Sequence, residues 1–239
     1  MDPLTATAAS GLRARMESLD LLANNVANAS TGGYKADREF YTLYADPEAQ
    51  DSGSASRMPL IERPWIDLSQ GLVHETGSPL DVALSGPGFF AVNGPSGPLY
   101  TRNGNFRLAA GGTLVTADGY PVRGTGGVPV ALDSFRPVEI DADGTIRQDG
   151  VTLGKLEVLD FTSAGLAKRG ANYFRTTDPA APSGASVEQG KLEASNTGSA
   201  EAAVRLVSVM RQFEMLQKAV TLGSEMNQQA VQQVARVGS

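Results

Sequence analysis

Apolar residues recur at seven-residue spacing along the C-terminal end of the chain. One series runs through Leu206, Phe213, Val220, Asn227 and Val234, and the second runs through Val209, Leu216, Gly223, Ala230 and Val237. This spacing is typical of a helix that buries one seam against another helix, and it continues for about four to five heptads. A shorter series at Leu12, Leu19 and Val26 predicts a second helix of this kind near the N-terminus.

The two helices have recognisable ends. The first is predicted over residues 4–28, because Gly32 and Gly33 follow it as a C-terminal stop signal. The second is predicted over residues 200–235, preceded by capping side chains in 195–199, and it would be about 50 Å long. Neither helix can bury its apolar face alone. Each therefore needs a partner, which is the other terminus, another copy of the chain, or both.

The middle of the chain is expected to be β-rich. Four turn dipeptides, Asn103-Gly104, Asp118-Gly119, Asp143-Gly144 and Asp149-Gly150, separate short apolar runs. The expected strands are 80–84, 89–92, 99–102, 113–116, 128–132, 138–140, 145–147 and 153–161. Strands this short and closely spaced favour an antiparallel sandwich or a barrel-like domain.

The fold class predicted from these patterns is α+β, with discontinuous N- and C-terminal coiled-coil-forming helices that bracket a mainly antiparallel β domain. We divide the chain into an N-terminal helix (1–35), a connecting segment (36–70), a β-rich domain (71–194) and a C-terminal helix (195–239) that pairs with the first. Residues 46–58 are small and polar, which is typical of a loop or linker.

Three asparagines, Asn24, Asn25 and Asn28, lie near the end of the first helix, although asparagine is a poor helix former. One interpretation is that the helix frays there into a turn. The other is that some of these amides form hydrogen bonds across a helix–helix contact and set its register.

Composition excludes several classes of protein. The net charge is −6, and the chain has no basic patch for binding phosphates, so we expect no nucleic-acid partner. There is no cysteine, and therefore no disulfide or thiolate metal site. No apolar stretch is long enough to form a transmembrane segment. The first ten residues lack a basic region followed by an apolar one, so we expect no cleavable signal peptide.

The sequence offers little catalytic chemistry. His74 is the only histidine, which makes a triad or a zinc site improbable. Asp141-Ala-Asp143-Gly144 resembles the start of a calcium loop, but its glycine comes two positions early and residue 152 is threonine. A plain Asp-Gly turn explains these residues better than a calcium site or an acidic catalytic cleft. We expect no catalytic residue, cofactor or metal.

Long motifs in a fixed order then point to a family. They are Asn24–Lys35, Thr76–Phe90, Tyr100–Phe106, Leu114–Val122 and Gln189–Asn196. Together they resemble the motifs of flagellar rod and hook proteins over nearly the whole chain. The residues carried over from the family motifs are Asn24, Asn25, Asn28, Gly32, Asp81, Gly86, Gly88, Arg102, Asn103, Gly104, Gly119, Gly190, Glu193 and Asn196.

The resemblance implies a structural subunit of the periplasmic rod of the basal body, which acts as the drive shaft for motility. Its partners would be other copies of itself, other proximal and distal rod proteins, and the flagellar type III export apparatus that delivers it without a cleaved signal. The terminal helices would order only on assembly, through a seam formed by Leu12, Leu19, Val26, Leu206, Val209, Phe213, Leu216, Val220, Asn227 and Val234.

Within the family, the compact length and the runs 143–146 and 154–156 are most similar to proximal-rod members, with distal-rod members as the close alternative. A different interpretation is a binding module on a coiled-coil stalk. A stalked module would form a closed oligomer with ordered ends in isolation, whereas a rod subunit would be a monomer with protease-sensitive ends.

Overall fold

The computed structural model describes residues 3–39, 41–45, 57–61, 65–162, 165–170, 172–179 and 181–237. The chain divides into two compact units. The first unit comprises Met1–Val26, Asp37–Trp65 and Ala200–Ser239, and the second comprises Ala27–Ala36 and Ile66–Ser199. Most of the polar segment 46–58 lies outside the described residues.

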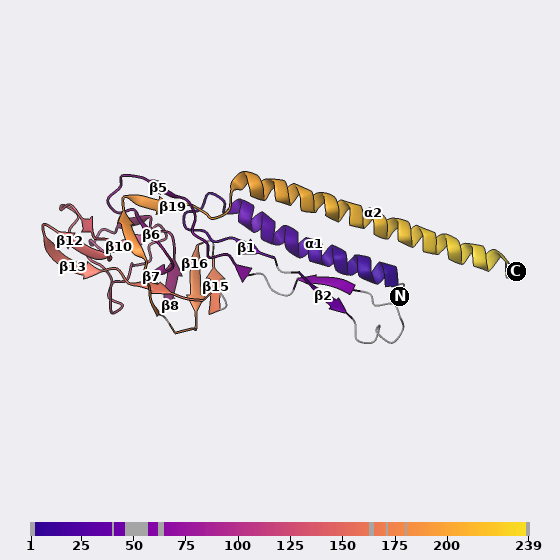
Figure 1. Ribbon diagram of the computed structural model, residues 1–239, viewed down its shortest axis with the longest axis horizontal. Helices are drawn as coiled ribbons and strands as arrows, with labels where there is room; N and C mark the ends of the chain where they lie inside the picture. Colours follow the sequence, from indigo (N-terminus) through magenta and orange to yellow (C-terminus); the bar gives the residue numbers. More distant parts are fainter. Residues whose placement is uncertain are drawn as a thin grey trace. The chain divides into compact units, whose positions relative to one another are not determined.

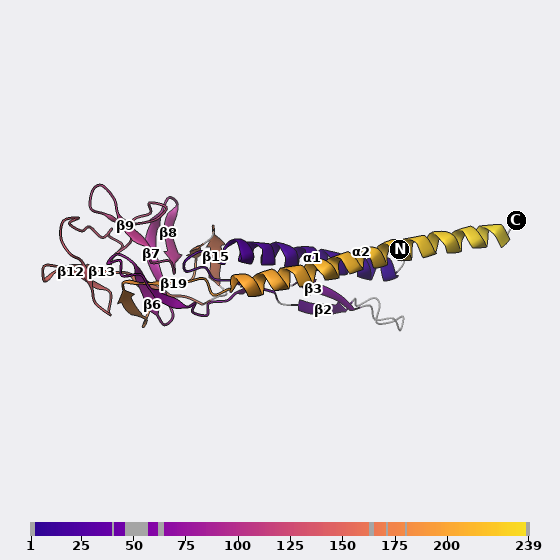
Figure 2. The same ribbon diagram turned by 90° about the horizontal axis from the view of Figure 1, so that it is seen from above.

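The first unit contains the two long helices, α1 (Pro3–Ala27) and α2 (Ser199–Val237), close to their predicted bounds. Figures 1 and 2 show α2 running alongside α1 in the opposite direction. The unit also contains β1 (Asp37–Arg38) and an antiparallel pair, β2 (Tyr41–Ala45) and β3 (Arg57–Ile61). None of the helices that the structure describes combines the length and apolarity needed to cross a membrane.

After β4 (Trp65–Ile66), the second unit is built from short strands. They are β5 (Val73–Glu75), β6 (Val82–Ser85), β7 (Phe89–Gly94), β8 (Gly97–Thr101), β9 (Phe106–Leu108), β10 (Leu114–Thr116), β11 (Glu139–Ile140), β12 (Thr145–Gln148), β13 (Val151–Lys155), β14 (Val158–Asp160), β15 (Leu166–Arg169), β16 (Tyr173–Thr176), β17 (Ala181–Pro182), β18 (Ser186–Gln189) and β19 (Lys191–Glu193). Six of them form one sheet in the order β15-β16-β8-β7-β14-β17, and three form β11-β12-β13. The remaining strands pair as β9–β10, β6–β18 and β5–β19, all antiparallel.

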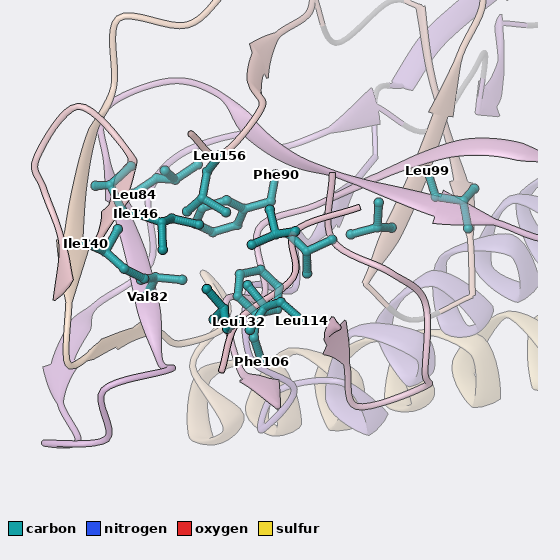
Figure 3. Packing of buried hydrophobic residues seen from close by; sticks show 14 of the residues in the cluster. Val82, Leu84, Phe90, Leu99, Phe106, Leu114, Leu132, Ile140, Ile146 and Leu156 are labelled. Atoms are coloured by element: carbon teal, nitrogen blue, oxygen red, sulfur yellow. The ribbon is translucent and has the colours of Figure 1, made fainter. Parts of the chain in front are cut away.

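Alternating apolar residues of these strands meet in two cores. In the larger core, Val82 and Leu84 of β6 pack with Phe90 of β7, and Phe90 meets the edge of Phe106 at a centroid distance of 5.3 Å (Figure 3). A smaller core gathers Phe89, Phe161 and Phe174. The predicted order, two terminal helices around a mainly antiparallel β region, is therefore confirmed, while coiled-coil formation stays a prediction.

Three of the four turn predictions are confirmed. Asp149-Gly150 has positive φ at both residues (49° and 78°) and joins β12 to β13 as a tight hairpin turn. Gly119 and Gly144 also have positive φ, both 85°. Asn103-Gly104, in contrast, is not a hairpin, because β8 before it pairs with β7 and β16 while β9 after it pairs with β10.

Two strand predictions were also wrong in detail. Residues 128–132 form only isolated bridges, at Pro129 and Ala131, because the proline at 129 cannot donate to a ladder. Residues 153–161 divide between β13 and β14, because the chain leaves the three-stranded sheet at Lys155 and joins the six-stranded sheet at Val158.

Gly104 is a point of close backbone approach rather than a turn. Its carbonyl accepts a hydrogen bond from the amide of Val82 at 3.0 Å, and an added Cβ would lie 1.7 Å from the Val82 carbonyl oxygen. Any side chain at this position therefore has to displace the backbone of β6, which lies in the larger core.

We predict that Gly104→Ala lowers the free energy of unfolding by about 1–3 kcal/mol, the usual cost of overpacking. The matched control is Gly111→Ala, because a Cβ at Gly111 meets no atom within 4 Å. Urea denaturation of both variants measures the difference, and equal stabilities would contradict the close approach.

Candidate functional site

The carboxylate of Glu193 is the centre of a buried ionic cluster in the second unit, which we call the clasp. The clasp consists of Glu193, Lys35 and Arg102, and their side chains are 0%, 1% and 3% exposed. Glu193 is the last residue of β19, and the amide of Gly71 also donates to its Oε1 at 2.9 Å. Residues from three stretches that are distant in the sequence, Lys35, Gly71 and Arg102, therefore donate to one carboxylate.

Lys35 joins the segment after α1 to the clasp. Its Nζ donates to Glu193 Oε1 and to the backbone carbonyl of Ser69, both at 2.6 Å. Burial lowers the pKa of Lys35, while Glu193, and more weakly Asp67, act in the opposite direction. The ammonium group is thus held by a carboxylate on one side and a carbonyl on the other.

Arg102 joins the end of β8 to the clasp. Its Nε donates to Glu193 Oε2 at 2.8 Å, and its Nη1 donates to the carbonyls of Gly86 at 2.8 Å and Gly88 at 2.7 Å. Both glycines have positive φ angles, 110° and 140°, which residues other than glycine rarely adopt. The Gly86–Gly88 bend therefore turns two carbonyl oxygens toward one guanidinium.

Asn196 extends the clasp toward the start of α2. Its Oδ1 accepts from the amide of Ala36 at 2.8 Å, and its Nδ2 donates to the carbonyl of Asp67 at 2.8 Å. The amide of Gly33 donates to the carbonyl of Glu193 at 2.8 Å, and the amide of Asn196 donates to the carbonyl of Tyr34 at 3.2 Å. Residues 33–36 and 193–196 therefore run side by side through both backbone and side-chain bonds.

Tyr34 anchors the same segment by packing. Its side chain is fully buried, and Nζ of Lys168 lies 4.3 Å from the centre of its ring. The chain 33–36 is thus held by an aromatic anchor, an ion pair and backbone bonds together.

The charges of the clasp are balanced by protein groups. Two cations face the carboxylate of Glu193, and the buried carboxylate of Asp67 contributes a second negative charge near Lys35. The remaining donors point at backbone carbonyls. A buried ion pair is tolerated only when its polar atoms are satisfied in this way.

A second motif cluster surrounds Asp81. Its two carboxylate oxygens accept from Thr76 Oγ1 and from Asn105 Nδ2, both at 2.8 Å. The amide of Gly190 donates to the carbonyl of Asp81, and the carbonyl of Gly190 accepts from the amide of Thr76, also at 2.8 Å. This cluster fixes the entry of β6 beside the turn that precedes β19.

The other residues predicted from the family motifs lie in three places. Next to the clasp, a Cβ on Gly32 would lie 3.1 Å from Oδ1 of Asn103. Gly119 lies apart, in the turn after β10. Gly104 belongs to the larger core, as described above.

The asparagines have separate roles. Asn25 is buried in the first unit, and its side chain both donates to the carbonyl of Asp37 (2.8 Å) and accepts from the amide of Asp37 (3.0 Å). It therefore joins α1 to the backbone of β1. Asn28 accepts from the amide of Thr31 in a turn, as the fraying interpretation predicted, and Asn24 is exposed on α1.

The described seam residues are the less exposed positions of α2. Val209 is buried, and Leu206, Phe213, Leu216, Val220 and Gly223 are half-buried, whereas their neighbours are mostly exposed. Asn227 and Val234 belong to α2, but their side chains lie outside the described residues.

On α1, Leu12, Leu19 and Val26 are half-buried, while the most buried line consists of Ala14, Ser18, Leu22 and Asn25. These two lines lie on adjacent parts of the same helix. The two helices lie next to each other at Gly11, because a Cβ there would lie 3.8 Å from Cδ1 of Leu216, an ordinary van der Waals distance. Arg205 of α2 also forms an ion pair with Glu39 at 3.8 Å.

Sequence reasoning missed one member of the clasp, Lys35, and two backbone partners of the clasp, the carbonyl of Ser69 and the amide of Gly71. Lys35 ends the first motif and was quoted with it, but nothing local distinguishes it from an exposed lysine. A buried lysine needs a carboxylate partner, so the presence of Glu193 in the last motif was the available signal.

The remaining candidate chemical groups are structural or exposed. His74 is exposed on β5, opposite Leu192. Asp141 pairs with Arg147 at 3.1 Å, and hydrogen bonds from Lys155 and Thr145 hold the pKa of Asp143 down at about 2. Among the residues that the structure describes, no three His, Asp or Glu side chains lie together as a metal site would require.

Comparison with known proteins gives three family matches along the chain. Residues 6–35 match the flagella basal body rod protein family, 83–148 match the flagellar hook protein FlgE/F/G D1 domain, and 188–233 match the C-terminal region of flagellar basal body rod FlgEFG proteins. Each match contains one charged residue of the clasp: the first contains Lys35, the second Arg102 and the third Glu193.

Individual relatives agree with these matches. Flagellar basal-body rod protein FlgF of Caulobacter vibrioides is 33% identical, over 92% of both chains. FlgF of Mesorhizobium japonicum is 32% identical over 82% of this chain and 83% of its own. FlgG of Agrobacterium fabrum is 33% identical over 92% of this chain and 95% of its own.

We predict that Glu193→Gln lowers the free energy of unfolding by about 3–5 kcal/mol, because it leaves two buried cations without their carboxylate. Lys35→Met is expected to lower the free energy of unfolding by less, because Glu193 still accepts hydrogen bonds from Arg102 and from the amide of Gly71. Urea denaturation ranks the two variants, and hydrogen exchange should show Lys35→Met loosening residues 28–36 first.

The control for this ranking is Arg147→Met, which removes a half-exposed ion pair that is worth about 0–1 kcal/mol. If Glu193→Gln were no more harmful than Arg147→Met, the clasp would not be a major source of stability.

Proposed function

The chain belongs to the flagellar basal-body rod protein family, and from this premise we propose that it is a proximal-rod subunit of the FlgF type. Members of this family are structural rod and hook proteins rather than enzymes, so the chain is a structural subunit of the rod. The observation that carries the finer proposal is that 92% of this chain aligns with a FlgF protein over 227 residues, whereas the same share needs 249 residues against a FlgG protein, so the FlgG alignment contains more gaps. The alternative is a distal-rod subunit, which an identity of 33% to that FlgG protein supports.

We propose that the subunit assembles through its terminal helices with other copies and with other rod proteins. The heptad positions of α2 are supported in this role by their low exposure beside α1. A second apolar face of α2 supports the presence of further neighbours. It carries Val204, Met215 and Met226 at eleven-residue spacing, and these side chains are 72%, 62% and 70% exposed.

In this proposal the clasp holds both ends of the β unit. Residues 33–36, which the clasp holds, begin six residues after the end of α1 at Ala27, and α2 begins three residues after Asn196. Torque applied to the helices would therefore enter the β unit through covalent connections pinned by buried ion pairs. We further propose that the subunit works in the periplasmic part of the rod and reaches it through the flagellar export apparatus.

Complementation distinguishes the two rod positions. We expect the gene for this chain to restore swimming to a mutant of its own species that lacks the FlgF-type subunit, and not to one that lacks the FlgG-type subunit. The diameter of swimming halos in soft agar measures the result. Rescue of only the second mutant would make the chain a distal-rod subunit.

We predict that Leu216→Asp abolishes this rescue, because it puts a charge on the half-buried seam beside Gly11. The control is Gln217→Asp, the same substitution at the exposed neighbouring position. Normal swimming with Leu216→Asp would show that Leu216 is not part of the assembly seam.

A further inference from the structure

One phenylalanine of the β unit is almost completely exposed. The side chain of Phe135 is 96% exposed, on the loop 133–136 between Leu132 and β11. An aromatic side chain in water is unfavourable, and large exposed apolar groups often mark interfaces. Val151 and Leu153 of β13 are also exposed, with exposures of 60% and 46%.

The loop that presents Phe135 is pinned by one buried side chain. Gln148 is 4% exposed, and it donates to the carbonyls of Asp133 at 2.8 Å and Arg136 at 3.0 Å. Its Oε1 accepts from the amide of Asp133 at 2.9 Å. Gln148 is the last residue of β12, so the loop is attached to the end of β12 that is followed by the hairpin turn to β13.

Charges lock the same loop further. Arg136 forms ion pairs with Asp133 at 3.1 Å and with Asp149 at 2.9 Å. The amide of Phe135 donates to Oδ1 of Asp133 at 3.0 Å. The backbone that carries Phe135 is therefore held in place before binding, which lowers the entropy that the loop loses when it binds a partner.

The same unit contains an open cavity that is large enough to admit an aromatic ring. Its volume is about 700 Å³; Leu156, Val158, Leu159, Pro182 and Ala185 supply apolar lining, beside polar residues such as Thr125, Ser183 and Ser186. The carboxylates at its rim are neutralised, because Asp143 pairs with Lys155 at 3.0 Å and Glu157 pairs with Arg123 at 2.8 Å. An apolar side chain can enter such a site without leaving an unpaired charge behind.

Phe135 cannot enter the cavity of its own chain. Asp143, which lines the cavity, precedes β12, whereas the pinned loop is attached to Gln148 and Asp149 at the other end of β12. Four strand residues separate these two ends by roughly 13 Å. The anchor and the cavity are therefore two different surfaces of one unit.

We propose that Phe135 of one copy inserts into this cavity of the next copy. A contact between two different surfaces is head-to-tail, so it adds subunits in a row instead of closing a dimer. The inference rests on the proposed self-association, but it uses a surface separate from the helix seam.

Disulfide trapping in the full chain tests the contact, because the chain has no cysteine of its own. The two variants are Ser134→Cys, beside the anchor, and Ser186→Cys, which lines the cavity; both positions are exposed. When the two variants are mixed and mildly oxidised, we expect a disulfide-linked dimer with one copy of each. A variant that carries both cysteines is expected to form a ladder of linked species larger than the dimer. Absence of the mixed dimer, or dimers of Ser134→Cys with itself as the main product, would overturn the proposal.

Two controls separate the contact from other effects. Adding Phe135→Ser to Ser134→Cys should lower the mixed product at least tenfold without changing the melting temperature, because Phe135 makes no part of the core. Leu72→Cys, an equally exposed position with 83% exposure, should not pair with Ser186→Cys. If either control gave as much cross-linked dimer as the original pair, the disulfides would come from random collisions between copies, and the proposal would be overturned.

The Leu216→Asp background distinguishes this contact from the helix seam. If the ladder persists in Leu216→Asp while swimming is lost, the two surfaces act independently, as we propose. If the ladder disappears with Leu216→Asp, the β contact is a consequence of helix assembly and the proposal of an independent anchor fails.

Discussion

The carboxylate of Glu193 is the group on which the rest of the β unit depends. It lies between Lys35 and Arg102 with almost no exposure to water, and each of its oxygens accepts from a cation at 2.6–2.8 Å. Taking three charges out of water is costly, so the arrangement is stable only when every partner is present. The segment after α1, the end of β8, the approach to β5 and the last strand therefore depend on one another in the folded unit.

This constraint separates the chain into parts with different stability. The β unit has two aromatic-rich cores and the clasp, so its interior is satisfied within one copy. The two long helices bury one line of side chains along each other and leave Val204, Met215 and Met226 in water. A helix with that much exposed apolar surface gains stability from neighbours, which is what a subunit of a polymeric rod requires.

Much of the fold was predictable because its signals are local. The heptad spacing predicted both helices to within one or two residues, and the Asp-Gly dipeptides located turns because their backbone conformations favour those residues. The errors also have local causes. Asn103-Gly104 has the composition of a hairpin turn, but the tertiary fold uses the missing side chain of Gly104 for contact with Val82.

The sequence by itself determined the two terminal helices, the β-rich middle between them, the absence of thiol chemistry and the membership of a rod and hook family, since these depend on periodicity, composition and continuous motifs. Only the tertiary structure decided which motif residues meet. Lys35 and Glu193 are 158 positions apart, and whether a lysine is buried depends on the chain that surrounds it. The same holds for Phe135, whose exposure follows from a bond network centred on Gln148. Long-range pairing of this kind leaves no periodic signal, because the residues that meet share a place in space and not a spacing along the chain.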